Sequence, residues 1–198
     1  MDQIILASSS KTRKELLESA GICFESQPAK IDEQEIRASL QAEKRDAFVI
    51  AEMLAEHKAL VVSRKRPDAL VIGADQILEC KNVIFSKPES RTKARQQLTL
   101  LRDKEHRLVS SVVVAQSGER LWHNTDSALL QMRSFSDLFL DDYLTDLGEG
   151  LLDSPGCYRV EGRGVQLFAR ITGDYFTILG LPLLPLLDYL RLRGSVVE

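Results

Sequence analysis

The sequence predicts a mixed α/β fold, in which a mixed sheet is flanked by helices. Short apolar runs that suit strands alternate with longer segments whose apolar residues recur at helical spacing. The clearest strand is the apolar run at residues 70–78, and the clearest helix spans about residues 43–64. Because strands and helices alternate along the chain, an α/β or α+β class with a mixed sheet is expected.

The bulk composition limits the size and class of the protein. Its 198 residues are enough for one sizeable core, in one or two lobes, but too few for two large domains. Hydrophobic residues make up 44% and charged residues 28%, as in soluble globular proteins. The formal net charge of -3 argues against a nucleic-acid coat protein or a basic membrane binder. The longest apolar stretch, at about 178–190, is interrupted by Asp188, Gly and Pro, so we expect no membrane span.

The cysteines indicate a reduced, cytoplasmic protein. Cys23, Cys80 and Cys157 are odd in number and widely spaced, and no pair has the C-x-x-C spacing. Neither a structural zinc site nor a disulfide framework is therefore expected. The N-terminus has Asp2 and only a brief apolar run, which does not fit a secretory signal.

The N-terminal part of the chain predicts a strand, a helix and a second strand. Residues 3–7 form an apolar run, and residues 11–20 fit a helix for which Gly21 is a plausible stop. Residues 22–26 fit a short strand. The polar segment 28–42 is expected to be irregular.

Two residues in the next two elements conflict with their surroundings. On the predicted helix 43–64, Lys58 lies on the same stripe as Leu54 and Ala55, so it either snorkels to solvent or faces a cleft. In the predicted strand 70–78, Asp75 interrupts an apolar run. A carboxylate there is costly unless another group compensates its charge.

The second half of the chain predicts three more helices and a hairpin. A loop at 86–88 precedes the first helix, and 153–156 form another loop. The first helix is capped by Ser90 or Thr92 and ends near Arg102, and hairpin strands 107–115 and 120–132, joined at 117–119, follow it. A helix at 137–147 is capped by Ser136 and stopped by Gly148. After it come extended segments 158–164 and 165–171, a turn at 173–175, and an apolar helix at about 182–193.

The turn after the first strand has the composition of a phosphate site. Residues 8–13 are rich in Ser and Thr, which cap helices, and the basic residues Lys11, Arg13 and Lys14 lie in or beside them. Free N–H groups and the positive end of the helix dipole attract anions at such a junction. The alternative is an ordinary strand–helix junction that happens to be basic.

A wider set of residues suits metal-dependent phosphate chemistry. Cations and N–H groups neutralise phosphate oxygens, whereas carboxylates hold Mg²⁺ or Mn²⁺ and activate water. No Walker A sequence or Gly-x-Ser-x-Gly elbow is present, and His106 and His123 fit structural roles in strands. The candidates are the turn from Ser8 to Arg13, the carboxylates Glu33 and Asp75, and the lysines Lys58 and Lys87. The alternatives are a structural aspartate at Asp75, a solvated loop carboxylate at Glu33 and a surface lysine at Lys87.

A series of short motifs runs along nearly the whole chain. They are Leu-Ala-Ser-Ser-Ser-Lys-Thr-Arg at 6–13, Asp-Glu at 32–33, Ala-Glu-His-Lys-Ala at 55–59, Gly-Ala-Asp-Gln at 73–76, Lys-Pro at 87–88, Gly-Cys-Tyr at 156–158, Glu-Gly at 161–162, Gly-Asp-Tyr at 173–175 and Gly-Leu-Pro-Leu at 180–183. In this order and spacing they resemble the Maf family of nucleoside triphosphate pyrophosphatases.

The resemblance implies one domain, residues 1–198, with a fold like that of inosine triphosphatase. That fold is a long twisted mixed sheet with a nucleotide cleft between two lobes. The family cleaves nucleoside triphosphates to a monophosphate and pyrophosphate, using a divalent metal, Mg²⁺ or Mn²⁺. Association of the family with septum formation leaves a nucleotide-binding regulator as an alternative, and a generic phosphatase is a third.

The resemblance also implies a role for each site residue. Asp75 accepts a proton from the attacking water, and Glu33 and Asp75 bind the metal. The triphosphate is bound by four further residues, Ser8, Arg13, Lys58 and Lys87.

Three positions accompany base preference in the family, and here they are Thr12, Gln76 and Glu161. All three match the 7-methyl-GTP branch rather than the dTTP/UTP branch. Two departures from the family pattern, Lys11 for Pro and Ser-Pro at 154–155 for Lys-Ala, put that preference in doubt. A nucleotide substrate is expected, with no nucleic acid or membrane partner, and the apolar C-terminal helix and the hairpin are candidate surfaces for a homodimer.

Overall fold

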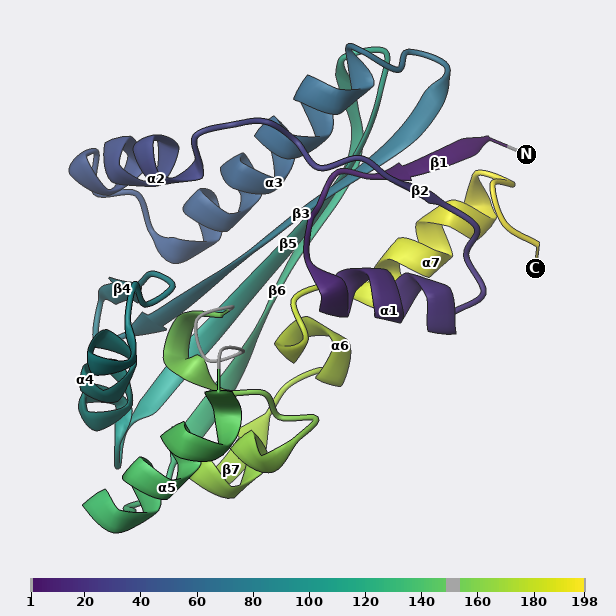
Figure 1. The fold of residues 1–198 in the computed structure, drawn as a ribbon. Coiled ribbons are helices and arrows are strands. Elements are labelled where there is room, and N and C mark those ends of the chain that lie inside the picture. The colour runs from purple at the N-terminus through teal and green to yellow at the C-terminus, as the bar shows by residue number, and fades with distance from the viewer. Residues whose placement is uncertain (1, 149–153, 198) are drawn as a thin grey trace. The chain divides into compact units, whose positions relative to one another are not determined.

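The computed structural model describes residues 2–148 and 154–197 and confirms the mixed α/β class (Figure 1). The strands are β1 (Gln3–Leu6), β2 (Glu25–Ser26), β3 (Ala69–Cys80), β4 (Val83–Phe85), β5 (Glu105–Gln116), β6 (Glu119–Met132) and β7 (Phe168–Thr172). The helices are α1 (Lys11–Ser19), α2 (Glu33–Ala42), α3 (Ala47–Ser63), α4 (Arg91–Leu101), α5 (Asp137–Leu147), α6 (Tyr175–Ile178) and α7 (Leu183–Leu192).

The described strands form one mixed sheet. Their order is β2-β1-β3-β5-β6-β7, and β4 pairs with β3. Strand β1 is parallel to both β2 and β3, whereas β4 is antiparallel to β3 and β7 is antiparallel to β6. The hairpin predicted at 107–132 is present as β5 and β6, with its turn at 117–118.

The chain divides into two compact units. Unit 1 comprises Met1–Gln76, Val109–Ser127 and Asp174–Glu198, and unit 2 comprises Ile77–Leu108 and Ala128–Gly173. Strands β3, β5 and β6 each contribute residues to both units.

The core of unit 1 covers both faces of its part of the sheet. Alternate residues of β1 point to opposite faces, so Ile4 and Leu6 belong to one cluster and Ile5 to another. The first cluster includes Leu17 of α1 and Leu186 of α7, whereas the second includes Val62 of α3. Burial on both faces explains why the predicted strands are continuous apolar runs.

Gly73 brings β3 into direct contact with the backbone of α3. A Cβ atom at this position would lie 2.2 Å from the carbonyl oxygen of Ala55 and 2.7 Å from the amide nitrogen of Ala59. Any side chain would therefore force the helix away from the strand. Because Lys58 is on α3 and Asp75 is on β3, this close approach determines the distance between them.

Unit 2 has its own core, which includes buried polar side chains. His106 is 2% exposed, and its Nε2 lies 2.6 Å from the hydroxyl of Tyr158. The ring of Phe168 packs edge-on against Tyr158. Burial lowers the pKa of His106 to about 4, so the imidazole is neutral at pH 7, in keeping with the expected structural role.

Two predicted irregular segments contain helices. The sequence predicts an irregular segment at 28–42, but α2 occupies Glu33–Ala42. Asp32 caps this helix by accepting from the Glu35 amide, and acidic residues fill its first turn, which the helix dipole favours. The turn expected at 173–175 likewise precedes a helix, because Asp174 caps α6.

Three predicted extended segments, 22–26, 158–164 and 165–171, contain less strand than expected. Residues 22–26 contain only the two-residue strand β2. Within 158–171, Arg163–Leu167 form a 3-10 turn and only β7 is a strand. The turn brings the backbone at Gly164 close to the carbonyl oxygen of Arg159. A Cβ atom at position 164 would lie 2.4 Å from that oxygen, so only glycine fits there without a shift of the backbone.

The remaining predicted helices are present, with α1, α3, α4, α5 and α7 beginning or ending within a few residues of the predicted bounds. Ser90 rather than Thr92 caps α4, and Ser136 caps α5. Residue 153 of the predicted loop 153–156 lies outside the described part of the chain. Across residues 2–148 and 154–197, no helix is long and apolar enough to cross a membrane.

Candidate active site

Lys58 and Asp75 form a buried ion pair in unit 1. Lys58 Nζ lies 2.7 Å from Asp75 Oδ1, and the two side chains are only 7% and 6% exposed. The same ammonium lies 3.0 Å from Oε2 of Glu33, whose side chain is 43% exposed. Lys58 therefore bridges two carboxylates, and its position on the apolar face of α3 reflects this pairing rather than snorkelling.

The two oxygen atoms of Asp75 have different environments. Oδ1 accepts the hydrogen bond from Lys58, whereas Oδ2 is buried and has no hydrogen-bond partner among the described residues. A buried carboxylate oxygen without a partner is costly, so it is a position where a bound water, metal or substrate group would be stabilised.

Glu33 is positioned by the start of α2. It is the first residue of the helix, directly after the cap Asp32. The Glu33 and Asp75 oxygens that contact Lys58 are at most 5.7 Å apart, the sum of their 3.0 and 2.7 Å distances to Nζ. No cluster of three or more His, Cys, Asp or Glu that could hold a metal occurs within the described ranges. Two carboxylates nevertheless fit Mg²⁺, which is commonly held by one or two carboxylates plus substrate phosphates.

Arg13 joins three separate segments of unit 1. Its Nε donates to the Gly180 carbonyl at 2.7 Å, and its Nη1 donates to the carbonyl of Ala74 at 2.9 Å and to Ser8 Oγ at 3.2 Å. Burial lowers the pKa of Arg13, and the negative charges of Asp75 and Glu33 oppose this shift. A buried guanidinium whose hydrogen-bond acceptors among the described residues are all neutral is suited to an anionic ligand.

The turn before α1 has the geometry expected of an N-terminal cap. Ser10 accepts from the Arg13 amide at 3.4 Å, and Ser8 Oγ accepts from the Ser10 amide at 3.2 Å. Thr12 is half-buried on the first turn of α1. Lys11, which departs from the family pattern, has a side chain that is 82% exposed and pairs with Glu15. This departure therefore lies on the solvent side of the helix.

Gln76 follows Asp75 on β3 and is surrounded by hydrogen-bond acceptors. Its Nε2 lies 3.0 Å from Ser110 Oγ, 3.1 Å from the Thr177 carbonyl and 3.0 Å from the Ile178 carbonyl. Ser110 and the residues of α6 were not among the sequence candidates. The capping residue Asp174 was the available signal for α6, but nothing in the sequence indicated that β5 and α6 would meet at Gln76.

Within unit 1, Lys58 contacts Glu33 and Asp75, and Arg13 contacts Ser8 and the carbonyl of the residue before Asp75. Gln76 follows Asp75 on β3 but bonds other residues. Lys87 and Glu161 lie in unit 2, and both are exposed. In unit 2, Ser154 precedes a tight turn in which Gly156 and Cys157 have positive φ angles of 77° and 56°. The buried Cys157 thiol has a pKa raised by burial to about 12, so it is not a nucleophile at neutral pH.

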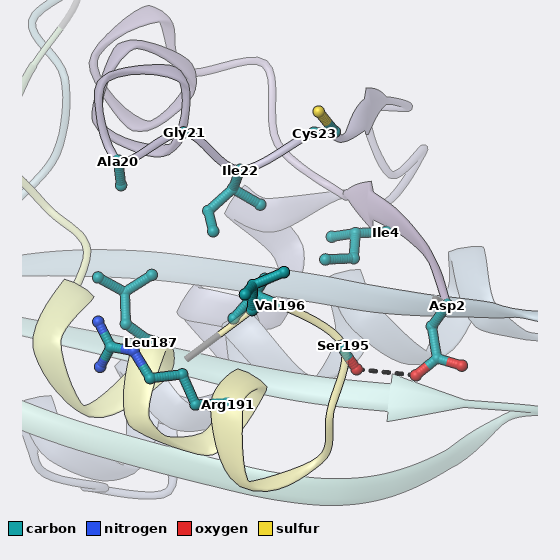
Figure 2. A pocket seen from close by; sticks show the side chains of 11 residues that line it. Asp2, Ile4, Ala20, Gly21, Ile22, Cys23, Leu187, Arg191, Ser195 and Val196 are labelled. Carbon is teal, nitrogen blue, oxygen red and sulfur yellow. Dashed lines mark hydrogen bonds between the residues drawn. The ribbon is translucent and has the colours of Figure 1, made fainter.

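A pocket elsewhere in unit 1 contains none of these residues. Its volume is about 340 Å³. It lies between the loop after α1, the start of β1 and α7 (Figure 2). Its lining is mainly apolar, with Leu187 and Val196 on one side and Ile22 on the other, and Ser195 donates to Asp2 at 2.8 Å. It holds no buried charge comparable to the Lys58–Asp75 pair.

Comparison with known proteins identifies the family. The model of the Maf-like protein family matches residues 3–193. A nucleoside triphosphate pyrophosphatase of Paramagnetospirillum magneticum is 52% identical over 98% of this chain and 100% of its own length. A 7-methyl-GTP pyrophosphatase of Rhizobium etli is 44% identical over 98% of each chain, and one of Brucella abortus is 46% identical over 96% of this chain and 95% of its own. The chain belongs to the Maf family.

Proposed function

We propose that this protein is a nucleoside triphosphate pyrophosphatase, which hydrolyses a nucleoside triphosphate to the monophosphate and pyrophosphate. Membership of the Maf family and the activities named for its relatives support this function. The single structural observation that carries it is the buried Asp75 carboxylate, with one oxygen held by Lys58 and the other unpartnered.

Asp75 is suited to act as the general base. Lys58 compensates its charge and fixes its orientation through Oδ1, so that Oδ2 is available to a water molecule. The water oxygen attacks the α-phosphorus while its proton passes to Oδ2. The bond between the α-phosphorus and the bridging oxygen breaks, and pyrophosphate leaves.

Glu33 and Asp75 are the residues that would hold a divalent cation, Mg²⁺ or Mn²⁺, together with phosphate oxygens. When bound, the cation would neutralise charge on the triphosphate during cleavage. Carboxylate oxygens are the donors that such a cation prefers: Glu33 is half-exposed, and Oδ2 of Asp75 has a second lone pair besides the one that would accept the proton.

Cationic and hydroxyl groups would bind the triphosphate. In unit 1 these are Ser8, Arg13 and Lys58, of which Arg13 is already immobilised by its contacts to Gly180 and Ala74. Immobilisation before binding lowers the entropy lost on binding. We propose Lys87 of unit 2 as a further triphosphate contact, on the strength of the Lys-Pro motif.

We propose 7-methyl-GTP as the preferred substrate, with Thr12, Gln76 and Glu161 as the specificity positions. A carboxylate at position 161 can accept hydrogen bonds from the guanine N1–H and amino group and suits the positive charge of a methylated guanine. The biological role that follows is cytoplasmic removal of modified nucleotides before they are incorporated. The activity named for the relatives from Rhizobium etli and Brucella abortus supports this substrate.

A product assay tests both levels of the proposal. The protein is incubated with Mg²⁺ or Mn²⁺ and with 7-methyl-GTP, GTP, dTTP, UTP or 5-methyl-UTP. We expect release of pyrophosphate rather than orthophosphate, fastest from 7-methyl-GTP. Faster release of pyrophosphate from dTTP or UTP would still identify a nucleoside triphosphate pyrophosphatase, but it would contradict the proposed preference for 7-methyl-GTP. Release of orthophosphate alone would instead identify a generic phosphatase.

The variant Asp75→Asn separates catalysis from binding. It keeps the size of the side chain but removes the proton acceptor, so turnover should fall by at least about 10²-fold while nucleotide binding persists. If the parent protein binds nucleotides without turnover, and the variant behaves identically in dividing cells, the alternative of a nucleotide-binding regulator of septum formation is favoured.

A further inference from the structure

The side-chain amide of Gln76 can adopt only one orientation. Two of the three atoms that face its Nε2, the carbonyl oxygens of Thr177 and Ile178, can only accept hydrogen bonds. The nitrogen end of the amide must therefore face them, because the reverse orientation would place Oε1 against two other oxygens.

Ser110 strengthens this constraint because its own proton is already used. Its hydroxyl donates to the Thr177 carbonyl at 2.7 Å, which leaves only lone pairs for Gln76. Ser110 is 0% exposed, so bulk solvent does not reach this contact. The hydroxyl therefore acts toward Gln76 as an acceptor.

Thr177 is itself held from two further sides. Its amide donates to the cap Asp174 at 2.8 Å, and its hydroxyl donates to Asp126 Oδ2 at 2.8 Å. Thr177 is 0% exposed. The carbonyl that receives both Ser110 and Gln76 is thus a fixed point of unit 1.

The opposite end of the amide is left for a ligand. The side-chain hydrogen bonds that Gln76 makes with the described residues all run through Nε2 and none through Oε1, and the side chain is half-buried. Successive side chains of β3 point to opposite faces, so Gln76 does not contact Asp75 merely by following it. Arg13 links the two, because it adjoins Gly180 beside Gln76 and interacts with the negative charge of Asp75. The acceptor of Gln76 therefore borders the site that contains the catalytic carboxylate.

We propose that Ser110 is a positioning residue that, with the carbonyls of Thr177 and Ile178, holds Gln76 so that it offers the nucleobase a hydrogen-bond acceptor. This inference rests on the proposed function and on contact between Gln76 and the base. The favoured base is one that presents a donor to Oε1. Guanine-type bases present two adjacent donors, N1–H and the 2-amino group, whereas adenine presents on that edge one donor, its 6-amino group, beside the acceptor N1.

The test compares two neighbouring serines of β5. Ser111 is also 0% exposed, but its side chain bonds Thr125 instead of Gln76, so Ser111→Ala is a matched control for Ser110→Ala. The measurement is kcat/KM for GTP and for ATP. We expect wild-type protein to prefer GTP and Ser110→Ala to reduce this preference about three- to tenfold through KM, with kcat unchanged. Ser111→Ala should retain the preference.

The outcomes separate this inference from the proposed function. An unchanged GTP preference in folded Ser110→Ala, or no preference in wild type, overturns the role of Ser110 while pyrophosphate release stands. If wild type releases no pyrophosphate from any nucleotide, the proposed function fails. In that case the dissociation constants for GTP and ATP are measured for wild type, Ser110→Ala and Ser111→Ala. A GTP preference that only Ser110→Ala reduces supports the role of Ser110, and an unchanged preference in Ser110→Ala overturns it.

A spectroscopic measurement does not depend on catalysis or on the stability of a variant. The side-chain amide protons of Gln76 are identified by NMR as the resonances that disappear in Gln76→Met. In wild type and in Ser111→Ala they should be protected from hydrogen exchange. In Ser110→Ala exchange should be about three- to tenfold faster. Unprotected protons in wild type would overturn the proposal.

Discussion

Replacing Lys58 by Met should strongly destabilise unit 1. The substitution conserves the apolar stem but removes the charge that compensates Asp75, whose side chain is 6% exposed. Glu33 is 43% exposed and can recover hydration, so the loss falls mainly on Asp75. Removing one partner of a buried ion pair costs about 3–5 kcal/mol, and this is the expected fall in the free energy of unfolding.

A double-mutant cycle isolates the contribution of the pair. Asp75→Asn alone should cost less, about 1–3 kcal/mol, because Lys58 retains Glu33 at 3.0 Å and the amide is neutral. In the double variant neither residue leaves an uncompensated buried charge. Its loss should be smaller than the sum of the two single losses by at least about 1 kcal/mol.

Urea unfolding followed by tryptophan fluorescence measures these losses. Trp122 is the single tryptophan of the chain, and it stacks on Tyr189 within unit 1 at 4.9 Å between ring centroids. Two results would refute the reasoning. One is a loss below about 1 kcal/mol for Lys58→Met, which is typical of an exposed ion pair. The other is additivity of the two single variants within about 0.5 kcal/mol.

Three further predictions follow from other contacts. Gly73→Ala should lower the free energy of unfolding by at least about 1–3 kcal/mol, because its Cβ would lie 2.2 Å from a backbone oxygen of α3, and pyrophosphatase activity should fall as well. A variant with wild-type activity and stability would show that α3 does not have to lie this close to β3. Glu33→Gln should raise the Mg²⁺ concentration needed for half-maximal activity about tenfold, whereas the exposed Glu35→Gln should not; equal effects would remove Glu33 as a metal ligand. The pKa of His106 is about 4 in the folded protein and about 6.5 in the unfolded chain, so the unfolded chain binds the proton first as the pH drops. The free energy of unfolding should therefore fall by about 2 kcal/mol between pH 7 and pH 5. Urea unfolding at the two pH values should show this fall for His123→Gln but not for His106→Gln.

The local pattern of the sequence was sufficient for most elements of the fold. The boundaries of these elements depend on residues that are close in sequence. Examples are the apolar run of β3, which is buried on both faces, and the Ser136 cap of α5. The sequence does not predict α2, because its apolar residues Ile36, Ala38, Leu40 and Ala42 recur at every second position rather than at helical spacing, although its cap Asp32 and its acidic first turn are visible. The 3-10 turn Arg163–Leu167 could not be predicted, because it depends on the close approach of Gly164 to Arg159.

The same distinction applies to the candidate site. The sequence by itself showed two misplaced charges, Lys58 on an apolar helix face and Asp75 in an apolar strand, and the family resemblance assigned them roles. Only the tertiary structure showed that each compensates the other, because Gly73 lets α3 contact β3 and brings Nζ to 2.7 Å from Oδ1. The orientation of Gln76 likewise depends on Ser110 and α6, which are 34 and about 100 residues away along the chain. Periodicity reports how a segment faces its surroundings, but hydrogen bonds between distant segments depend on packing that no local pattern encodes.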